Sequence, residues 1–184
     1  MCQTVLRDIQ FSDIAILLRS KTHFNEYMEF FANANIPLTC ESNKEFKDYD
    51  SLLVIENILT GIEYFRANLN DDTVLKYVYT SIGRSFLFNY EDKQIYDSIK
   101  NKSYKNDIIL KKCAGIAELS KTNSVEKTFN MMLSEFKFIN NLHRIDRPAQ
   151  NLEKIEFLSG MSKNFDTSGL SFSEFASFFK KIDE

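Results

Sequence analysis

The sequence predicts a mainly α-helical protein, a helical bundle that carries one short β-α unit near its N-terminal end. Turn-forming residues are scarce, with 5 Gly and 2 Pro among 184 residues, which disfavours an all-β architecture. Apolar residues recur with helical spacing from about Phe46 onward. One continuous aliphatic run, Ile14 to Leu18, is typical of a strand buried on both faces.

The β-α unit consists of this strand and the helix that follows it. After Arg19 and Ser20, apolar residues fall on one helical face until Ile36 and Pro37 end the helix; they are Phe24, Tyr27, Met28 and Phe31. Parallel sheets need several strands covered on both faces, so we expect this unit to be part of a larger, RecA-like α/β domain that is incomplete here. The predicted division places residues 1–45 in this unit and residues 46–184 in an α-helical domain.

The helices of the second domain follow from capping signals and apolar stripes. Asn70-Asp71-Asp72 suits a helix start, Asn123 to Glu126 resembles a capping box, and Ser171 to Glu174 is a complete S-x-x-E box. The stripes expected in the core are Leu52, Ile55, Leu59, Ile62 and Phe65; Val74, Leu75, Val78, Tyr79 and Ile82; Ile95 and Ile99; Ile109, Cys113, Ile116 and Leu119; Phe129, Met132, Leu133 and Phe136; Leu152, Ile155, Leu158 and Met161; and Phe175, Phe178, Phe179 and Ile182.

Composition and charge exclude several classes of protein. The formal net charge of -3 gives no overall attraction to nucleic acid, although a local basic groove is compatible with it. The 3 cysteines are widely spaced and follow no apolar signal segment, which favours the reducing cytoplasm over a disulfide framework. No apolar run approaches the roughly 20 residues that a membrane span needs. We therefore expect a soluble cytoplasmic protein with no membrane partner.

Catalytic and cofactor motifs are absent from the sequence. The glycines are isolated, so no phosphate-binding loop is present, and His23 and His143 lie far from each other and from any cysteine pair, which disfavours zinc. Acidic pairs such as Asp71-Asp72 and Glu91-Asp92 suit helix starts better than acid-base catalysis. We expect no bound metal and no catalysis by this chain alone.

Arg19 is the one residue placed as though for chemistry. An arginine at the carboxyl end of a parallel strand lies where α/β folds bind ligands, and its fixed charge and fork of donors suit a phosphate. The alternative is a surface arginine in a local ion pair. Among the aromatic residues, Tyr90, Tyr96 and Tyr104 are the least committed to a core stripe and are candidates for stacking on single-stranded bases.

Residues around Arg19 resemble a known family. The segment "DIAILLRS", Asp13 to Ser20, followed by a helix and "NIPL", Asn35 to Leu38, resembles motif IV of superfamily 1 DNA helicases of the UvrD/RecB type. Leu18 stands where UvrD and its nearest relatives usually have a tyrosine that stacks on adenine. The resemblance is therefore closest to the AddA (helicase-exonuclease) branch.

The similarity continues in the same order along nearly the whole chain. Phe46 and Asp50 match an aromatic and an acidic position before a long helix; Asn68, Asp72 and Ser81 match an N-P-x-x-D and R-S-P-L/I region; Arg147, Asn151 and Leu152 match an R-x-A-N-L helix; Gly169, Leu170 and Phe175 or Phe178 match a G-L-x-x-F helix. Three positions depart from the family pattern. Ser51 replaces an aliphatic residue, Leu69 a proline and Thr80 a common arginine.

The resemblance implies a piece of an ATP-dependent DNA helicase with an exonuclease, acting in double-strand break repair and recombination. Residues 1–45 would begin motor domain 2A, and residues 46–184 would form domain 2B. In the full-length motor Arg19 would be the catalytic and ATP-binding residue that contacts the γ-phosphate. ATP and Mg would bind the parent protein only, and the expected partners are DNA and an AddB-like subunit.

A free-standing α-helical protein-interaction module is the competing interpretation, favoured by the acidic charge balance and the missing catalytic cluster. The two interpretations differ in what they expect of Ile14 to Leu18. In an independent domain this segment should be packed, whereas in a piece of a larger domain it should be partly exposed, swapped or frayed.

Overall fold

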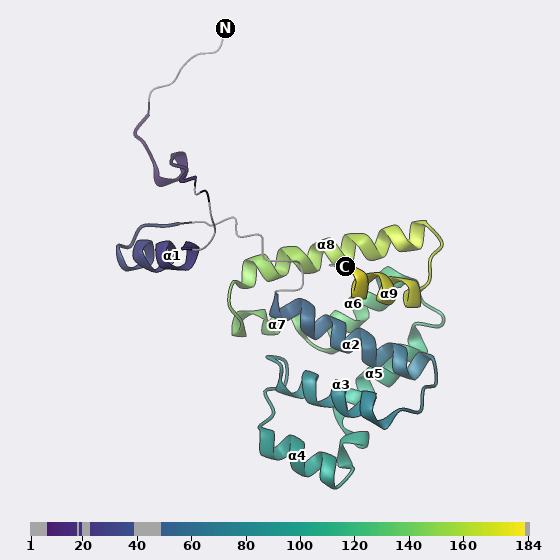
Figure 1. Ribbon diagram of the computed structural model, residues 1–184. Helices are drawn as coiled ribbons and strands as arrows, with labels where there is room; N and C mark the ends of the chain where they lie inside the picture. The colour runs from purple at the N-terminus through teal and green to yellow at the C-terminus, as the bar shows by residue number, and fades with distance from the viewer. Residues whose placement is uncertain (1–6, 18, 20–22, 39–48, 183–184) are drawn as a thin grey trace. The chain divides into compact units, whose positions relative to one another are not determined.

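The computed structural model describes residues 7–17, 19, 23–38 and 49–182 (Figure 1). The chain divides into two compact units, Met1–Asn43 and Lys44–Glu184. The regular elements of the described residues are all helical, which confirms the mainly α class. In order they are η1 (Phe11–Asp13), α1 (Phe24–Asn33), α2 (Asp50–Arg66), α3 (Asp72–Arg84), α4 (Asp92–Lys100), η3 (Ser103–Asn106), α5 (Ile108–Leu119), α6 (Val125–Glu135), α7 (Phe138–Asn141), η4 (Leu142–Arg144), α8 (Pro148–Thr167) and α9 (Phe172–Lys181).

The predicted strand is not found in residues 14–17, the described part of the aliphatic run. Ile14 has extended backbone (φ -106°, ψ 125°), but the segment is paired with no strand among the described residues. Ile14, Ile16 and Leu17 are 60%, 49% and 95% exposed. A strand is held by hydrogen bonds to its neighbours, so a local aliphatic pattern forms one only where partner strands are present.

The predicted helix of the N-terminal unit is confirmed by α1. Asn35, just past its end, has a left-handed backbone with φ 54°, a conformation that asparagine tolerates better than most residues. Tyr27 and Phe30 of α1 are exposed. The described part of this unit therefore leaves much of its apolar surface open.

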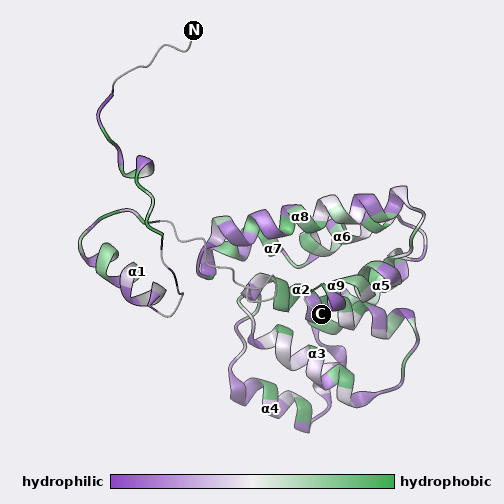
Figure 2. Cartoon of the chain, turned by 45° about the horizontal axis from the view of Figure 1, so that its top comes forward, coloured by the Kyte–Doolittle hydropathy of each residue, from purple (hydrophilic) through white to green (hydrophobic). Residues whose placement is uncertain are grey.

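The helical unit is built around α2, which packs against α3, α5, α8 and α9 (Figure 1). Five aliphatic side chains of α2 are completely buried, and each contributes about 1.5–3 kcal/mol by leaving water. They are Leu52, Ile55, Ile58, Leu59 and Ile62. Hydrophobic and hydrophilic residues alternate along the helices in Figure 2, as amphipathic elements require. No helix in the described ranges is both long and apolar enough to cross a membrane.

A close approach of α2, α3 and α5 depends on Gly61. A Cβ at this position would lie 2.9 Å from Cys113 Sγ and 2.9 Å from Val78 Cγ1. Both of these neighbours are completely buried. Burial also raises the pKa of the Cys113 thiol to about 12, so this side chain behaves as a small apolar group.

Aromatic contacts join the last helices of the unit. The Phe175 ring of α9 meets Phe129 of α6 and Phe165 of α8 edge to face, with ring centroids 5.6 and 5.4 Å apart. Such pairs add to the stabilisation that comes from burial alone. The predicted core stripe of the last helix is thus confirmed at Phe175 and Phe179, which are both completely buried.

The predicted helix starts are present. Asp71 caps α3 by accepting a hydrogen bond from Thr73 N, and Ser171 forms a complete capping box with Glu174. The capping box predicted over Asn123 to Glu126 is not formed, because Ser124 is the cap of α6 and accepts a hydrogen bond from Lys127 N. Asp166 of α8 instead accepts from the first backbone N–H groups of α6, at 2.6 and 2.9 Å.

Candidate functional site

Arg19 is exposed and lies along the chain between residues 14–17 and α1. The nearby Arg7 binds Asp13 through two contacts, Nη1 to Oδ2 at 2.7 Å and Nη2 to Oδ1 at 2.5 Å. The hydrogen bond from Arg7, aided by one from Gln10 N, holds the pKa of Asp13 below its usual value. The carboxylate that opens the motif is thus paired with Arg7.

Asn151, a motif position of the helical unit, fixes where two helices begin. Its Oδ1 accepts from Ser51 N at 3.4 Å, and its Nδ2 donates to the carbonyls of Asp146 and Arg147 at 2.9 and 3.0 Å. Asn151 is buried, and Arg147 has a left-handed backbone with φ 54°. Since buried amides need their hydrogen bonds, this side chain specifies how the start of α2 sits on the start of α8.

Ser51, which departs from the family pattern, is completely buried beside this amide. Its Oγ has no hydrogen-bond partner within the part of the chain that the structure describes. An unsatisfied buried hydroxyl destabilises a fold by about 1–3 kcal/mol. The aliphatic residue that the family places here avoids this loss.

Asp72, another motif position, ties the start of α3 to the segment after α4. Its carboxylate lies 2.7 Å from Lys105 Nζ and 2.8 Å from Lys76 Nζ, and it accepts a hydrogen bond of 2.5 Å from the Tyr104 hydroxyl. The hydrogen bonds from Lys105, Lys76 and Tyr104 hold the pKa of Asp72 far below its usual value. This cluster is a structural junction.

The G-L-x-x-F positions also have structural roles. Gly169 takes φ 69°, a left-handed conformation that turns the chain out of α8. Leu170 N donates to Phe165 O across this turn at 2.9 Å. Of the two candidate phenylalanines, Phe175 is completely buried and Phe178 partly so.

The structure separates the three uncommitted tyrosines. Tyr104 is completely buried, and Tyr90 is partly buried with its hydroxyl 3.5 Å from Asp107 Oδ2, so neither offers a free face for stacking. Tyr96 is 64% exposed and keeps that possibility open. The core partners of Tyr104 lie far from it in sequence, and local spacing gives no signal of them.

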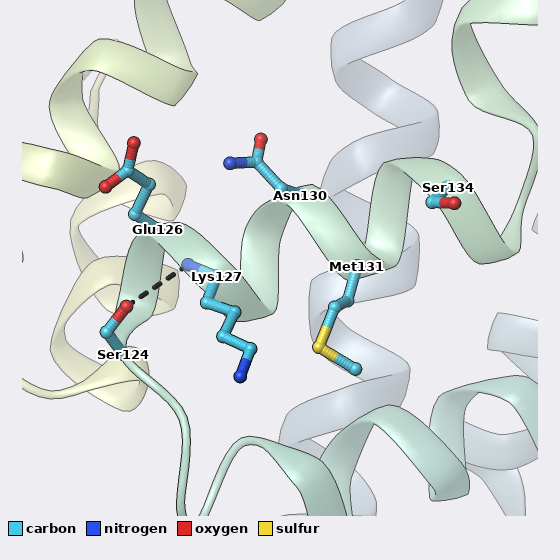
Figure 3. Close-up of a pocket in the computed structure, with 6 residues that line it drawn as sticks. All are labelled: Ser124, Glu126, Lys127, Asn130, Met131 and Ser134. Atoms are coloured by element: carbon cyan, nitrogen blue, oxygen red, sulfur yellow. Dashed lines mark hydrogen bonds between the residues drawn. The ribbon is translucent and has the colours of Figure 1, made fainter.

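A shallow pocket of about 420 Å³ runs along α6 (Figure 3). Its lining residues are Ser124, Glu126, Lys127, Asn130, Met131 and Ser134. They come from one helix and its cap, and they do not bring a nucleophile together with a base. Among the described residues no group of three or more His, Cys, Asp or Glu side chains is placed to hold a metal ion.

Two contacts that organise the helical unit are missed by sequence reasoning. Asn151 reaches a residue 100 positions away, and Asp166 reaches residues 40 and 41 positions away. Their only sequence signal is the match of Asn151 to a family position, which carries no geometric information. The described residues of this unit that match the family therefore position helices, and Arg19 stays the candidate for chemistry that the sequence predicts.

Comparison with known proteins places these observations in a family context. No family model matches the chain. It is similar to the AddA subunit of the ATP-dependent helicase/nuclease of Lactobacillus helveticus (strain DPC 4571), with 29% identity over 152 residues, covering 76% of this chain and 11% of that protein. It is also similar to the AddA subunit of Lysinibacillus sphaericus (strain C3-41), with 39% identity over 57 residues, covering 31% of this chain and 5% of that protein.

The chain thus spans about a tenth or less of the length of these curated relatives. Both carry the name to which the motif resemblance points, so the resemblance to the AddA branch is confirmed. The chain is thus similar to part of the A subunit of these ATP-dependent helicase/nucleases.

Proposed function

We propose that the chain is the segment of an AddA-type ATP-dependent DNA helicase/nuclease that begins domain 2A and contains domain 2B. The printed names of the two relatives and the order of the matched motifs support this proposal. The parent protein would process DNA double-strand breaks together with an AddB-like partner. The helical unit would guide DNA or pack against that partner.

The exposed aliphatic segment is the structural observation that carries the proposal. Ile14, Ile16 and Leu17 turn about half or more of their surface to solvent, although a free-standing domain gains stability by burying such residues. A continuous aliphatic run suits a strand covered on both faces in a parallel sheet. Exposure of this segment supports the larger-domain interpretation over the free-standing interaction module.

Arg19 would act in the nucleotide cleft of the complete motor. The carboxyl end of the adjacent strand would place its guanidinium at the γ-phosphate, where its donors would stabilise the negative charge that grows as the phosphoryl group transfers. Mg would be held by other parts of the parent protein. This chain alone would not hydrolyse ATP, because a single arginine does not form a preorganised site.

Replacement of Arg19 in the full-length protein tests the assignment. Arginine fingers contribute about 10³- to 10⁵-fold to turnover, so Arg19→Ala should lower DNA-stimulated ATP hydrolysis by at least about 10³-fold. Arg19→Lys should restore only a small part, because an ammonium group lacks the planar fork. Lys127→Ala is the control, because it removes an exposed cation of the helical unit and should leave turnover near normal. Near-normal ATPase activity of Arg19→Ala would sink the assignment.

The size of the native polypeptide separates the two interpretations. An antibody raised against this chain should detect a product several-fold larger than 21.5 kDa in the source cell. A product of about 21.5 kDa would show that no motor surrounds the chain and would favour the interaction module.

A further inference from the structure

Two exposed tyrosines lie on the hairpin formed by α3 and α4. Tyr77 of α3 is 57% exposed and Tyr96 of α4 is 64% exposed. The remaining described tyrosines of the helical unit, residues 49, 64, 79, 90 and 104, are buried or partly buried. Tyrosine is a large amphipathic side chain, and two of them exposed on neighbouring helices present aromatic ring faces to solvent.

Both tyrosines lie on the same face of the hairpin. Arg84 Nε binds Asp92 Oδ1 at 2.8 Å and so joins the end of α3 to the start of α4. Tyr77 is seven positions before Arg84, and Tyr96 is four positions after Asp92, so each tyrosine shares a helical face with one member of this ion pair. The helices run antiparallel (Figure 1), because Asp72 at the start of α3 contacts Tyr104 just beyond α4.

Two lysines flank Tyr96 along α4. Lys93 and Lys100 lie three positions before and four positions after Tyr96, on the same exposed face of α4. A third cation, Lys105, lies at the far end of the hairpin with its charge shared with Asp72. Asp72 of α3 is paired with two lysines. Of the two carboxylates of α4, Asp92 is paired with Arg84, and Asp97 is in no described ion pair.

We propose that this face, Tyr77, Tyr96, Lys93 and Lys100, binds single-stranded nucleic acid. Nucleic acid is the occupant that matches both components, since base faces stack on aromatic rings and lysines attract the phosphates between the bases. A duplex hides its base faces within the stack, so the tyrosines select the single strand. A protein partner would need a broad apolar surface. This face does not provide one, because Lys93 and Lys100 flank Tyr96 along the helix. The proposal rests on the proposed function, because a helicase produces single strands.

The test measures binding of this 184-residue chain to a fluorescein-labelled oligothymidine of about 20 nucleotides by fluorescence anisotropy. Tyr96→Ala and Tyr77→Ala should each weaken binding by about five- to a hundred-fold, whereas Tyr96→Phe should bind almost normally, since the ring stacks and the hydroxyl does not. Lys93→Ala and Lys100→Ala should each lower the slope of log K against log salt by about 0.7. These four side chains are exposed, so folding should be unchanged.

Two controls lie elsewhere in the unit. Phe157→Ala removes an exposed aromatic ring of α8 and Lys127→Ala an exposed cation of α6, and both should bind like the unchanged chain. Absence of binding at about 100 μM chain and about 100 mM salt would overturn the proposal. Equal loss in the controls, or a preference for the same sequence as a duplex, would also overturn it. The Arg19 assignment would survive such failures, because it is read from ATP turnover in the full-length protein.

Discussion

Gly61 gives the sharpest test of how the helical unit is packed. Substitution by alanine places a methyl group 2.9 Å from both Cys113 Sγ and Val78 Cγ1, in a region with no exposed surface. Overpacking costs about 1–3 kcal/mol, and two such contacts place Gly61→Ala in the upper part of that range. The helix gains about 1 kcal/mol from losing a glycine. We therefore expect a net loss of about 1–2 kcal/mol in the free energy of unfolding.

Urea denaturation followed by far-UV circular dichroism measures this difference. The matched control is Gly160→Ala in α8, where a Cβ meets nothing within 4 Å, so only the gain of about 1 kcal/mol should remain. Adding Cys113→Ala to Gly61→Ala should recover part of the clash, since one of the two contacts is removed. If Gly61→Ala raised the free energy of unfolding as Gly160→Ala does, the close crossing of α2, α3 and α5 would be refuted.

Four further outcomes concern the buried polar and titratable groups. Asn151→Ala should lower the free energy of unfolding by about 1–3 kcal/mol in urea denaturation, because it leaves the buried Ser51 N–H without its side-chain acceptor, whereas Ser51→Ala should raise it by up to about 1 kcal/mol. Burial raises the pKa of Asp166, but hydrogen bonds from the N–H groups of Glu126 and Val125 outweigh it, so the pKa in the folded state is lowered. Its stabilising effect should be complete above the unfolded pKa of about 4 and disappear as pH falls through the lower folded pKa, and an acid titration of Asp166→Asn should show a smaller loss. The Cys113 thiol, whose pKa burial raises to about 12, should react with a thiol reagent only as the chain unfolds; rapid labelling under native conditions would contradict its burial.

The sequence is informative wherever a structural decision is made by neighbours along the chain. The Ser171 and Glu174 box forms because its partners are three residues apart, and the helical stripes form because their period is local. Local spacing wrongly leaves Tyr104 outside the core stripes. Its hydroxyl donates a hydrogen bond to Asp72, which lies 32 residues away in the sequence. The strand expected at Ile14 needs partner strands, and no local pattern supplies these.

The candidate site shows the same division. Arg19 is singled out by its place after an aliphatic run and by the family resemblance, and its contact with a γ-phosphate stays a prediction. The surface of Tyr77 and Tyr96 is only half visible in the sequence, because Tyr96 stands outside the core stripes while Tyr77 carries no such signal. Their common face depends on how α3 folds back on α4, where Arg84 and Asp92 form an ion pair.

The central position of α2 has a consequence for synthesis on the ribosome. This helix precedes the others of its unit in the chain, yet it is covered by α8 and α9, the last to be made. At about 5–20 residues per second, the 115 residues from Arg66 to Lys181 take about 6–23 s to appear. For that time the apolar side of α2 lacks its final cover. Nascent chains of this protein should accordingly bind chaperones until α9 emerges, and release should follow its arrival.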